Sequence, residues 1–308
     1  MLDRLARRQV KDRDLVVGVG DDCAIVRTVA HSYQLITTDM LVEDDHFSLK
    51  WFSAYQIGQK LVEANVSDII CKGGRPRFAF LSMCLRSDTS YEWLKDFYQG
   101  LDDALARHQI SLAGGDTTHG AILVFNLTLT GEIEPHLIRL RSQAQVGDLI
   151  CVTGKLGGSA AGLSLLRAGL EGYLDDYLKP QARTYEEGKL IASYAHATID
   201  VSDGLASEVG HLARESKTGA VIFAEKVPLS WHTIEAGQRL NLDPLDFALY
   251  GGEDFQIVFT ISPPNLNLLQ NKFRDFEVVG EILPLSEGVF LSKNGLREPL
   301  KKGYDHFA

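Results

Sequence analysis

The sequence predicts two domains: an N-terminal α+β domain with a mixed sheet and helices, and a C-terminal α/β domain. The chain has 308 residues, more than one hydrophobic core usually serves. Short apolar stretches typical of strands alternate with longer stretches whose apolar residues recur at helical spacing. A polar turn interrupts this alternation soon after Pro135. We therefore expect one domain over residues 1–135 and a second over 136–308, with substrates in the cleft between them.

The N-terminal half contains two well-marked helices. The first, over 53–72, is closed by Gly73 and Gly74, and glycine after a basic last turn is a common helix stop. Ser90 is expected to cap the second, because an apolar face follows it. That face is formed by Leu94, Phe97, Leu101 and Leu105. The predicted strands of this half are 16–17, 24–26, 35–36, 78–85, 110–113 and 122–133.

The C-terminal half alternates strands and helices to its end. A glycine-rich loop over 154–162 opens its first helix, and the free amides of a helix start can hold a phosphate. It is not a Walker A motif, because the Gly-x-x-x-x-Gly-Lys-Ser/Thr spacing is absent, and tight helix–sheet packing is the slightly favoured alternative. Further helices are predicted at 186–196, 204–216, 233–240 and 265–274. Strands are predicted at 137–141, 149–153, 197–199, 220–224, 255–261 and 278–282, with a final hairpin over 288–295.

Composition is that of a soluble globular protein, with 45% hydrophobic and 23% charged residues. The net charge of −10 argues against a nucleic-acid partner, although acidic surfaces also simply keep proteins soluble. The four cysteines are far apart and include no Cys-x-x-Cys, so we expect reduced thiols rather than disulfides or a zinc site. No stretch approaches the length of a membrane span and no apolar leader is present. A cytoplasmic protein without a membrane partner is expected.

Carboxylates recur beside glycine, serine or threonine at the ends of predicted strands. Such corners offer oxygen ligands, and Mg²⁺ prefers a few carboxylates together with waters and substrate phosphates. Nucleophile machinery, a Rossmann fingerprint and the protein-kinase signature set are all missing. Phosphoryl transfer, which needs charge neutralisation and positioning more than covalent chemistry, fits this pattern. The corners are residues 18–22, 37–39, 114–117, 200–204 and 251–254.

Asp68 lies on the apolar face of the first predicted helix, with Ile57, Leu61 and Asn65. A carboxylate on such a face is costly to bury without a partner. A metal ion, a lysine or arginine, or a local backbone hydrogen bond could each be that partner. Spacing by itself leaves the three open.

Nine stretches, in order from about residue 15 to the C-terminus, resemble the thiamine-monophosphate kinase family. Each stretch is modest alone, but the ordered set is highly specific. This family belongs to the superfamily of aminoimidazole-ribonucleotide synthetase and selenophosphate synthetase, so the resemblance implies a two-domain synthetase-like fold. The stretches are 18–24 (GVGDDCA), 37–42 (TTDMLV), 46–47 (HF), 65–68 (NVSD), 113–117 (AGGDT), 152–154 (VTG), 199–205 (IDVSDGL), 251–254 (GGED) and 302–307 (KGYDHF).

The resemblance implies an enzyme, a phosphotransferase that uses ATP as co-substrate to convert thiamine monophosphate to thiamine diphosphate by direct in-line transfer. It implies several Mg²⁺ ions and a homodimer formed through the sheet of the first domain. Catalytic roles fall to Asp39 and Asp116, and Asp68 becomes an expected metal ligand. The implied metal ligands are Asp22, Thr37, Thr38, Asp39, Asp68, Asp116, Asp200 and Asp203. The residues implied to meet ATP are Gly115, Asp116, Arg141 and Ser202.

For the acceptor, the resemblance implies contacts from His46 and Glu253. Lys301 is the third predicted substrate residue. It stands where the family often has an aromatic residue for the substrate ring, so Tyr304 or a neighbouring aromatic is an alternative ring contact. The segment Cys71-Lys72-Gly73 replaces a more apolar helix end, and we expect it to be surface variation.

Two rival functions remain at this point. Another synthetase or kinase of the superfamily would share the aspartates and use a different acceptor. A selenophosphate synthetase would be expected to have a reactive cysteine in a glycine-rich N-terminal segment. The hydrogenase-maturation relative would be expected to have a cysteine at its C-terminal end, whereas this sequence ends Asp305-His306-Phe307-Ala308. A non-catalytic nucleotide- or metal-binding module is the alternative from another class.

Overall fold

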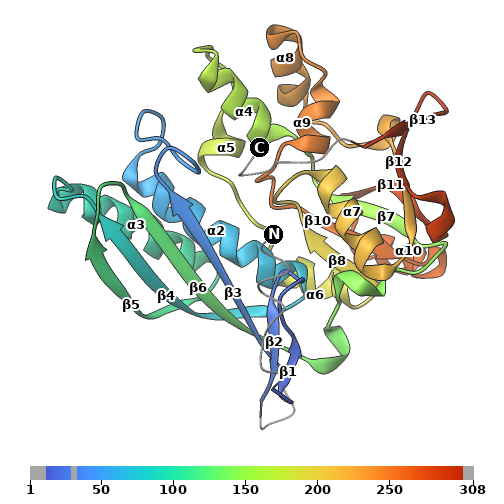
Figure 1. Ribbon diagram of the computed structural model, residues 1–308, viewed down its shortest axis with the longest axis horizontal. Coiled ribbons are helices and arrows are strands. Elements are labelled where there is room, and N and C mark those ends of the chain that lie inside the picture. Colours follow the sequence, from blue (N-terminus) through green and yellow to red (C-terminus); the bar gives the residue numbers. More distant parts are fainter. Residues whose placement is uncertain (1–11, 29–32, 301–308) are drawn as a thin grey trace.

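The computed structural model describes residues 12–28 and 33–300, and they form two sheets with their helices, one in each half of the chain (Figure 1). The first sheet has six strands in the order β1-β2-β3-β6-β4-β5. Neighbouring strands are antiparallel except for the parallel pair β4–β5, so the predicted mixed sheet is confirmed. Its strands are β1 Leu15–Val17, β2 Ala24–Arg27, β3 Tyr33–Val42, β4 Arg75–Leu85, β5 Ser111–His119 and β6 Val124–Ile133.

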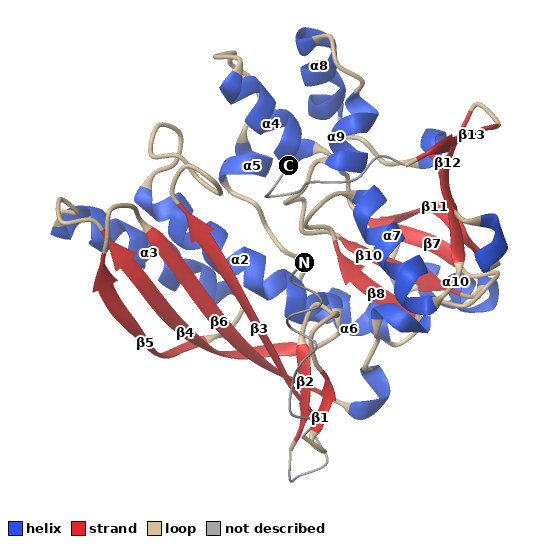
Figure 2. Cartoon of the chain, viewed as in Figure 1, coloured by secondary structure: helices blue, strands red, loops and turns tan. Residues whose placement is uncertain are grey.

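Two helices cover one face of this sheet, α2 (Ala54–Cys71) and α3 (Tyr91–Arg107) (Figure 2). Each begins at the predicted serine, since the Ser53 and Ser90 side chains accept the backbone amides of Gln56 and Trp93. None of the described helices lies on the opposite face in Figure 2. That face is partly apolar and exposed, with Met40 at 49%, Phe78 at 45% and Phe80 at 41%.

The second sheet has seven strands in the order β13-β12-β9-β11-β7-β10-β8. Alternate residues point to opposite faces of a strand, and here both faces are buried: Ile150 and Val152 of β7 pack in one core, and Cys151 between them packs in another. The strands are β7 Leu149–Thr153, β8 Ala197–Asp200, β9 Gly219–Phe223, β10 Ile257–Ile261, β11 Phe276–Leu283, β12 Val289–Lys293 and β13 Leu296–Pro299.

The helices of the C-terminal half lie around this sheet. Helix α7 packs against β8, β9 and β10, while α4, α8 and α9 pack on one another at the top of the view in Figure 1. The helices are α4 Gly158–Arg167, α5 Asp175–Leu178, α6 Tyr185–Ala192, α7 Leu205–Ser216, α8 Trp231–Leu240, α9 Pro244–Tyr250 and α10 Pro263–Gln270. No helix in the described residues is long and apolar enough to cross a bilayer.

Three strand predictions were wrong: one strand is absent and two run further than expected. The strand predicted at 137–141 is replaced by short 3-10 turns at Pro135–Leu137 and Arg141–Gln143, because this segment crosses between the two sheets. The Arg139 side chain holds the crossing in place by donating from Nε to the Ala195 carbonyl. Strands β3 and β5 run on through the acidic corners that were expected to end them. Helix α9 was missed, since its seven residues are too few to show a period.

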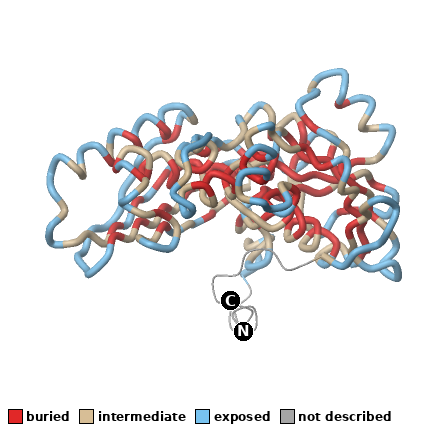
Figure 3. Tube along the Cα trace, turned by 90° about the horizontal axis from the view of Figure 1, so that it is seen from above, coloured by how far each residue is buried: buried red, intermediate tan, exposed pale blue. Residues whose placement is uncertain are grey.

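Helix α2 joins the two halves. It packs against β3 and β6 on one side and contacts β8 and α6 on the other. One continuous apolar core therefore includes Leu61 and Val66 of α2 together with Ile191 and Phe259 of the C-terminal half, and Figure 3 shows the buried segments of the two halves meeting in the middle of the molecule. The boundary predicted after residue 135 falls between β6 and β7 and stays a prediction.

Candidate active site

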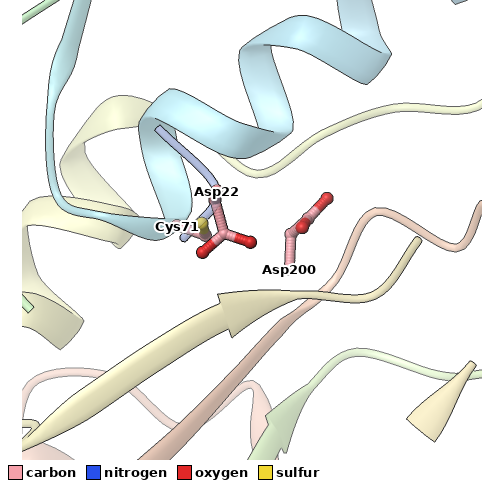
Figure 4. A group of neighbouring side chains, drawn as sticks. All are labelled: Asp22, Cys71 and Asp200. Carbon is pink, nitrogen blue, oxygen red and sulfur yellow. The ribbon is translucent and has the colours of Figure 1, made fainter. Parts of the chain in front are cut away.

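Four carboxylates converge where the two halves meet. Asp22 lies between β1 and β2, Asp39 on β3, Asp68 on α2, and Asp200 at the end of β8. Besides burial, the negative charge of Asp22 raises the pKa of each of the other three, Asp39, Asp68 and Asp200. The four carboxylates are therefore close together. Oxygens of Asp22 and Asp200 and the Cys71 sulfur lie within 4.8 Å of one another. Figure 4 shows these three side chains. The structure thus brings four of the predicted metal ligands into one place, which we call the carboxylate cluster.

Hydroxyl groups from neighbouring positions orient this cluster. The Thr37 hydroxyl donates to the Asp68 carboxylate, and Ser67 Oγ donates to Asp200 Oδ2 at 2.7 Å. Thr37 is itself a predicted ligand and lies on the same face of β3 as Asp39, because side chains alternate along a strand. Ser67 was not singled out from the sequence, although it lies next to Asp68 within the NVSD stretch.

Burial and like charge raise the pKa values of most of the cluster. Burial, and then the charge of Asp22, raises the pKa of Asp39 to about 6 and that of Asp200 to about 7. Burial, followed by the charges of Asp39, Asp200 and Asp22, holds the pKa of Asp68 well above its usual range. A cation among these oxygens would relieve both effects.

Asp22 differs from the others because two cations contact it. Burial would raise the pKa of Asp22, but the charges of Lys72 and Arg141 outweigh it and lower that pKa to about 2. Lys72 Nζ also lies 2.7 Å from Asp21 Oδ1 and donates to the Thr198 carbonyl at 2.6 Å.

Lys72 was expected to be surface variation, and that expectation was wrong: its side chain is 1% exposed. The end of α2 is covered by the C-terminal half, which no local pattern in the sequence predicts.

Arg141 was predicted to meet ATP. In this structure its guanidinium contacts Asp22 and its backbone amide donates to Asp21 Oδ2 at 3.0 Å. It therefore lies at the edge of the carboxylate cluster, where an anionic ligand would compete with Asp22 for its donors. The ATP contact stays a prediction.

The segment after β8 is held against the loop that follows α9. The Ser202 carbonyl accepts from the Glu253 amide at 2.9 Å, and an added Cβ on Gly252 would lie 1.9 Å from that same carbonyl oxygen. Only glycine allows this approach. Asp203 is fixed separately, because its amide donates to Glu208 Oε1 at 2.9 Å. The predicted ligands Asp200 and Asp203 and the predicted acceptor contact Glu253 are thus close in space.

The two predicted acceptor contacts meet through a residue that sequence reasoning missed. Lys60 of α2 pairs with Glu253 at 2.7 Å and donates to the His46 carbonyl at 3.1 Å. Its side chain is 0% exposed. A lysine on the buried side of an amphipathic helix is the signal that could have found it.

The glycine-rich loop holds a carboxylate of the chain itself. Asp254 accepts from the backbone amides of Gly157 at 2.7 Å and Ser159 at 3.3 Å, so it occupies the start of α4. An added Cβ on Gly157 would lie 2.9 Å from the Ala248 amide nitrogen. The close packing of this loop is therefore against helix α9 rather than against a sheet, so the predicted partner was wrong. The phosphate alternative stays a prediction.

Other predicted site residues are not brought to the cluster. The Thr38 side chain points to the open face of the first sheet, opposite to Thr37. Gly115 and Asp116 lie exposed on β5, an edge strand separated from β3 by β6 and β4, which is about 14 Å at the usual strand spacing. Lys301 lies outside the described residues, as does Tyr304.

Comparison with known proteins identifies the family. The AIR synthase related protein N-terminal domain model matches residues 20–133 and the C-terminal domain model matches residues 145–290. A thiamine-monophosphate kinase of Buchnera aphidicola subsp. Acyrthosiphon pisum (strain APS) is 37% identical over 98% of this chain and 95% of its own length. The chain belongs to the thiamine-monophosphate kinase family.

Solved structures agree with this assignment. The structure described as AaThiL complexed with AMPPCP and TMP matches 99% of this chain and 96% of its own, with 33% identity and a TM-score of 0.88. The hydrogenase maturation protein HypE of E. coli also superimposes, with a TM-score of 0.75 but 20% identity over 97% of this chain and 96% of its own. That second similarity shows a common fold and nothing more.

The donor set of the carboxylate cluster fits magnesium. Its candidate ligands are carboxylate and hydroxyl oxygens, which hard divalent cations prefer. The nearby sulfur of Cys71 is a poor match, since burial and the charge of Asp22 raise the pKa of its thiol and keep it protonated. This thiol and that of Cys23 instead donate to the Asp68 carbonyl at 3.2 and 3.3 Å.

Proposed function

We propose that this protein transfers the γ-phosphoryl group of ATP to thiamine monophosphate and releases thiamine diphosphate and ADP. The family membership supports this activity, and the related structure carries AMPPCP, an ATP analogue, together with TMP. The single observation in this chain that carries the proposal is the carboxylate cluster, in which Asp22, Asp39, Asp68 and Asp200 crowd together with more negative charge than the neighbouring cations balance.

Asp22, Asp39, Asp68 and Asp200 would hold Mg²⁺, with Thr37 and Asp203 beside them. Bound Mg²⁺ would neutralise the charge on the transferring phosphates and on the phosphate that accepts. The chain itself supplies placement: Thr37 and Ser67 fix the carboxylates they bond, and Arg141 offers a guanidinium at the edge of the cluster. The acceptor oxygen of thiamine monophosphate is already ionised, so in-line transfer needs no general base.

We further propose a homodimer formed through the first sheet. Its open face and the whole of β5 are exposed in a single chain, and an exposed edge strand with apolar neighbours invites pairing with another chain. A partner packed there would also place its own Asp116 and Gly115 near a second copy. Within one chain Asp116 is separated from Asp39 by strands β6 and β4. The proposed site is therefore one that two chains complete, in which Asp116 of one chain acts with the cluster of the other.

The test is product analysis. Purified protein is mixed with ATP, Mg²⁺ and thiamine monophosphate, and products are separated by chromatography. Thiamine diphosphate and ADP should form in equal amounts, and neither should form without Mg²⁺. Slow ADP release at the same rate with and without thiamine monophosphate would contradict the proposal and favour a nucleotide-binding module.

A further inference from the structure

Lys60 is a fully buried cation with contacts from several parts of the chain. Its ammonium lies 2.7 Å from Glu253 Oε1 and 2.8 Å from Oε2, and it donates to the His46 carbonyl at 3.1 Å. The Phe52 and Tyr177 rings complete its surroundings, with the ammonium 5.2 and 4.7 Å from their centroids. Rings at this distance attract a cation through their electron-rich faces.

These contacts come from segments that are far apart in the sequence. Phe52 and the His46 carbonyl precede α2, Tyr177 belongs to α5, and Glu253 lies in the loop after α9. The two rings also contact each other edge to face at 5.1 Å. Removing one partner of a buried ion pair leaves an uncompensated charge, so each of these segments is expected to depend on the same ammonium.

The Glu253 loop is one that needs such support. Glu253 and Phe255 have φ angles of 63° and 47°, a left-handed region that residues with side chains seldom adopt. Backbone of this kind persists where its surroundings hold it, and it is often found at functional sites. Here the Glu253 and Phe255 amides donate to the Ser202 and Val201 carbonyls at 2.9 and 3.0 Å, and Lys60 holds the carboxylate.

We infer that Lys60 is a positioning residue: its ammonium fixes the Glu253 carboxylate and the His46 turn in one arrangement, and so shapes the part of the site that receives thiamine monophosphate. The inference rests on the proposed function for the identity of the acceptor. It does not require Lys60 to touch a substrate. It states that the conformations of the 43–47 turn and the 251–255 loop depend on each other, because both segments bind the buried ammonium of Lys60.

Glu63 provides a matched control on the same helix. Its side chain is also 0% exposed, and it accepts from Arg107 at 2.8 Å and from the Ala182 amide at 2.9 Å. It therefore joins α2 to the C-terminal half through buried charge, as Lys60 does. Within the described residues its hydrogen bonds and ion pairs run to Arg107, His108 and Ala182, away from the 43–47 turn and the 251–255 loop. A purely structural role predicts similar behaviour for Lys60→Met and Glu63→Gln.

The first measurement is amide hydrogen exchange of the substrate-free protein. Lys60→Met should speed exchange in both 43–47 and 251–255 and leave the segment around 182 unchanged. Glu63→Gln should speed exchange around 182 and leave the other two segments unchanged. Equal, global acceleration in both variants would overturn the inference, and this result does not depend on which acceptor the enzyme uses.

The second measurement is steady-state kinetics with both substrates varied. Lys60→Met should raise the KM for thiamine monophosphate about tenfold or more. This is the size expected if the misplaced Glu253 carboxylate no longer accepts a hydrogen bond from the substrate. The KM for ATP should change less than about threefold, and Glu63→Gln should change neither constant. If wild-type protein makes no thiamine diphosphate, the proposed function fails; if wild type is active and Lys60→Met leaves the acceptor KM unchanged, this inference fails.

Glu253→Gln keeps the inference testable should Lys60→Met not fold. Glu253 is partly exposed, and its carboxylate contacts the same Lys60 ammonium that donates to the His46 carbonyl of the 43–47 turn. Faster exchange of 43–47 in Glu253→Gln would support the coupling. Exchange there identical to that of wild type would overturn it.

Discussion

The two ends of helix α2 carry buried charge in opposite ways. Near its C-terminal end, Asp68 lies among Asp22, Asp39 and Asp200, and burial and like charge raise the pKa of three of these four carboxyls. About two turns earlier, Lys60 is equally buried, yet a carboxylate, a carbonyl and two rings surround its ammonium. At the cluster the carboxylates outnumber the neighbouring cations Lys72 and Arg141, whereas the charge of Lys60 is matched by Glu253.

The difference teaches how one helix can serve two purposes. A matched buried pair fixes shape, and removing either partner should destabilise the protein. A cluster with excess negative charge is unfavourable by itself and leaves capacity for an added cation. Substitutions at the two ends should therefore have opposite effects on the stability of metal-free protein.

The largest expected effect is at the cluster. Asp39→Asn should lower turnover about a thousandfold, the scale of losing a group that stabilises transition-state charge, because a ligand oxygen is exchanged for a neutral amide. Its melting temperature without Mg²⁺ should equal or exceed that of wild type, since like charge is removed. A coupled ADP assay and a thermal melt give the two results, and near-normal turnover would contradict the assignment.

Asp116 is expected to act across two chains. Asp116→Asn and Asp39→Asn proteins should each be inactive alone. After mixing and subunit exchange, half of the dimers hold one chain of each kind, and each of those has one intact site. About a quarter of wild-type activity should return, measured with the same coupled assay; two separately tagged proteins confirm the exchange. No recovery in verified mixed dimers would place Asp116 outside the shared site.

The pH dependence of metal-free protein should sharpen the contrast. The pKa values of Asp39 and Asp200 are raised to about 6 and about 7, so the folded state binds more protons than the unfolded state between about pH 4 and pH 7. Their contribution to stability is full below pH 4 and is lost as pH rises through 6 to 7. Melting in chelator should therefore fall between pH 5 and pH 8, by a few degrees, and Mg²⁺ should restore it most at pH 8. A Mg²⁺ effect that is larger at pH 5 would count against the cluster.

The smallest expected effect is at Asp254, outside the cluster. Burial raises the pKa of Asp254 to about 7, although the amides of Gly157 and Ser159 oppose this. The folded state therefore holds its proton up to about pH 7, and stability is lost as pH rises through that value. The stability advantage of wild type over Asp254→Asn should be larger at pH 5 than at pH 8, by at most about 1.4 kcal/mol per pH unit crossed. Urea unfolding of both proteins at the two pH values measures this difference in stability. A wild-type advantage that grows with pH would contradict a raised pKa for Asp254.

Sequence alone determined most of the local structure and the chemistry-bearing stretches. The caps at Ser53 and Ser90, the periodicity of α2 and the alternation of β6 are local signals, and the structure follows them. The acidic corners were visible because aspartate beside glycine, serine or threonine is recognisable without a fold. The ordered set of nine stretches that resemble the family, most of them containing an aspartate, was enough to indicate it.

Only the tertiary structure decided which charges meet. Lys60 pairs with a carboxylate 193 positions away and Arg141 with one 119 positions away, and no local period reports such a distance. Lys72 was mistaken for a surface residue because its burial is imposed by the C-terminal half, and Asp116 is remote from Asp39 because β6 and β4 lie between their strands. Propensity and patterning act over a few residues, whereas the pairing of buried charges depends on how the whole chain packs.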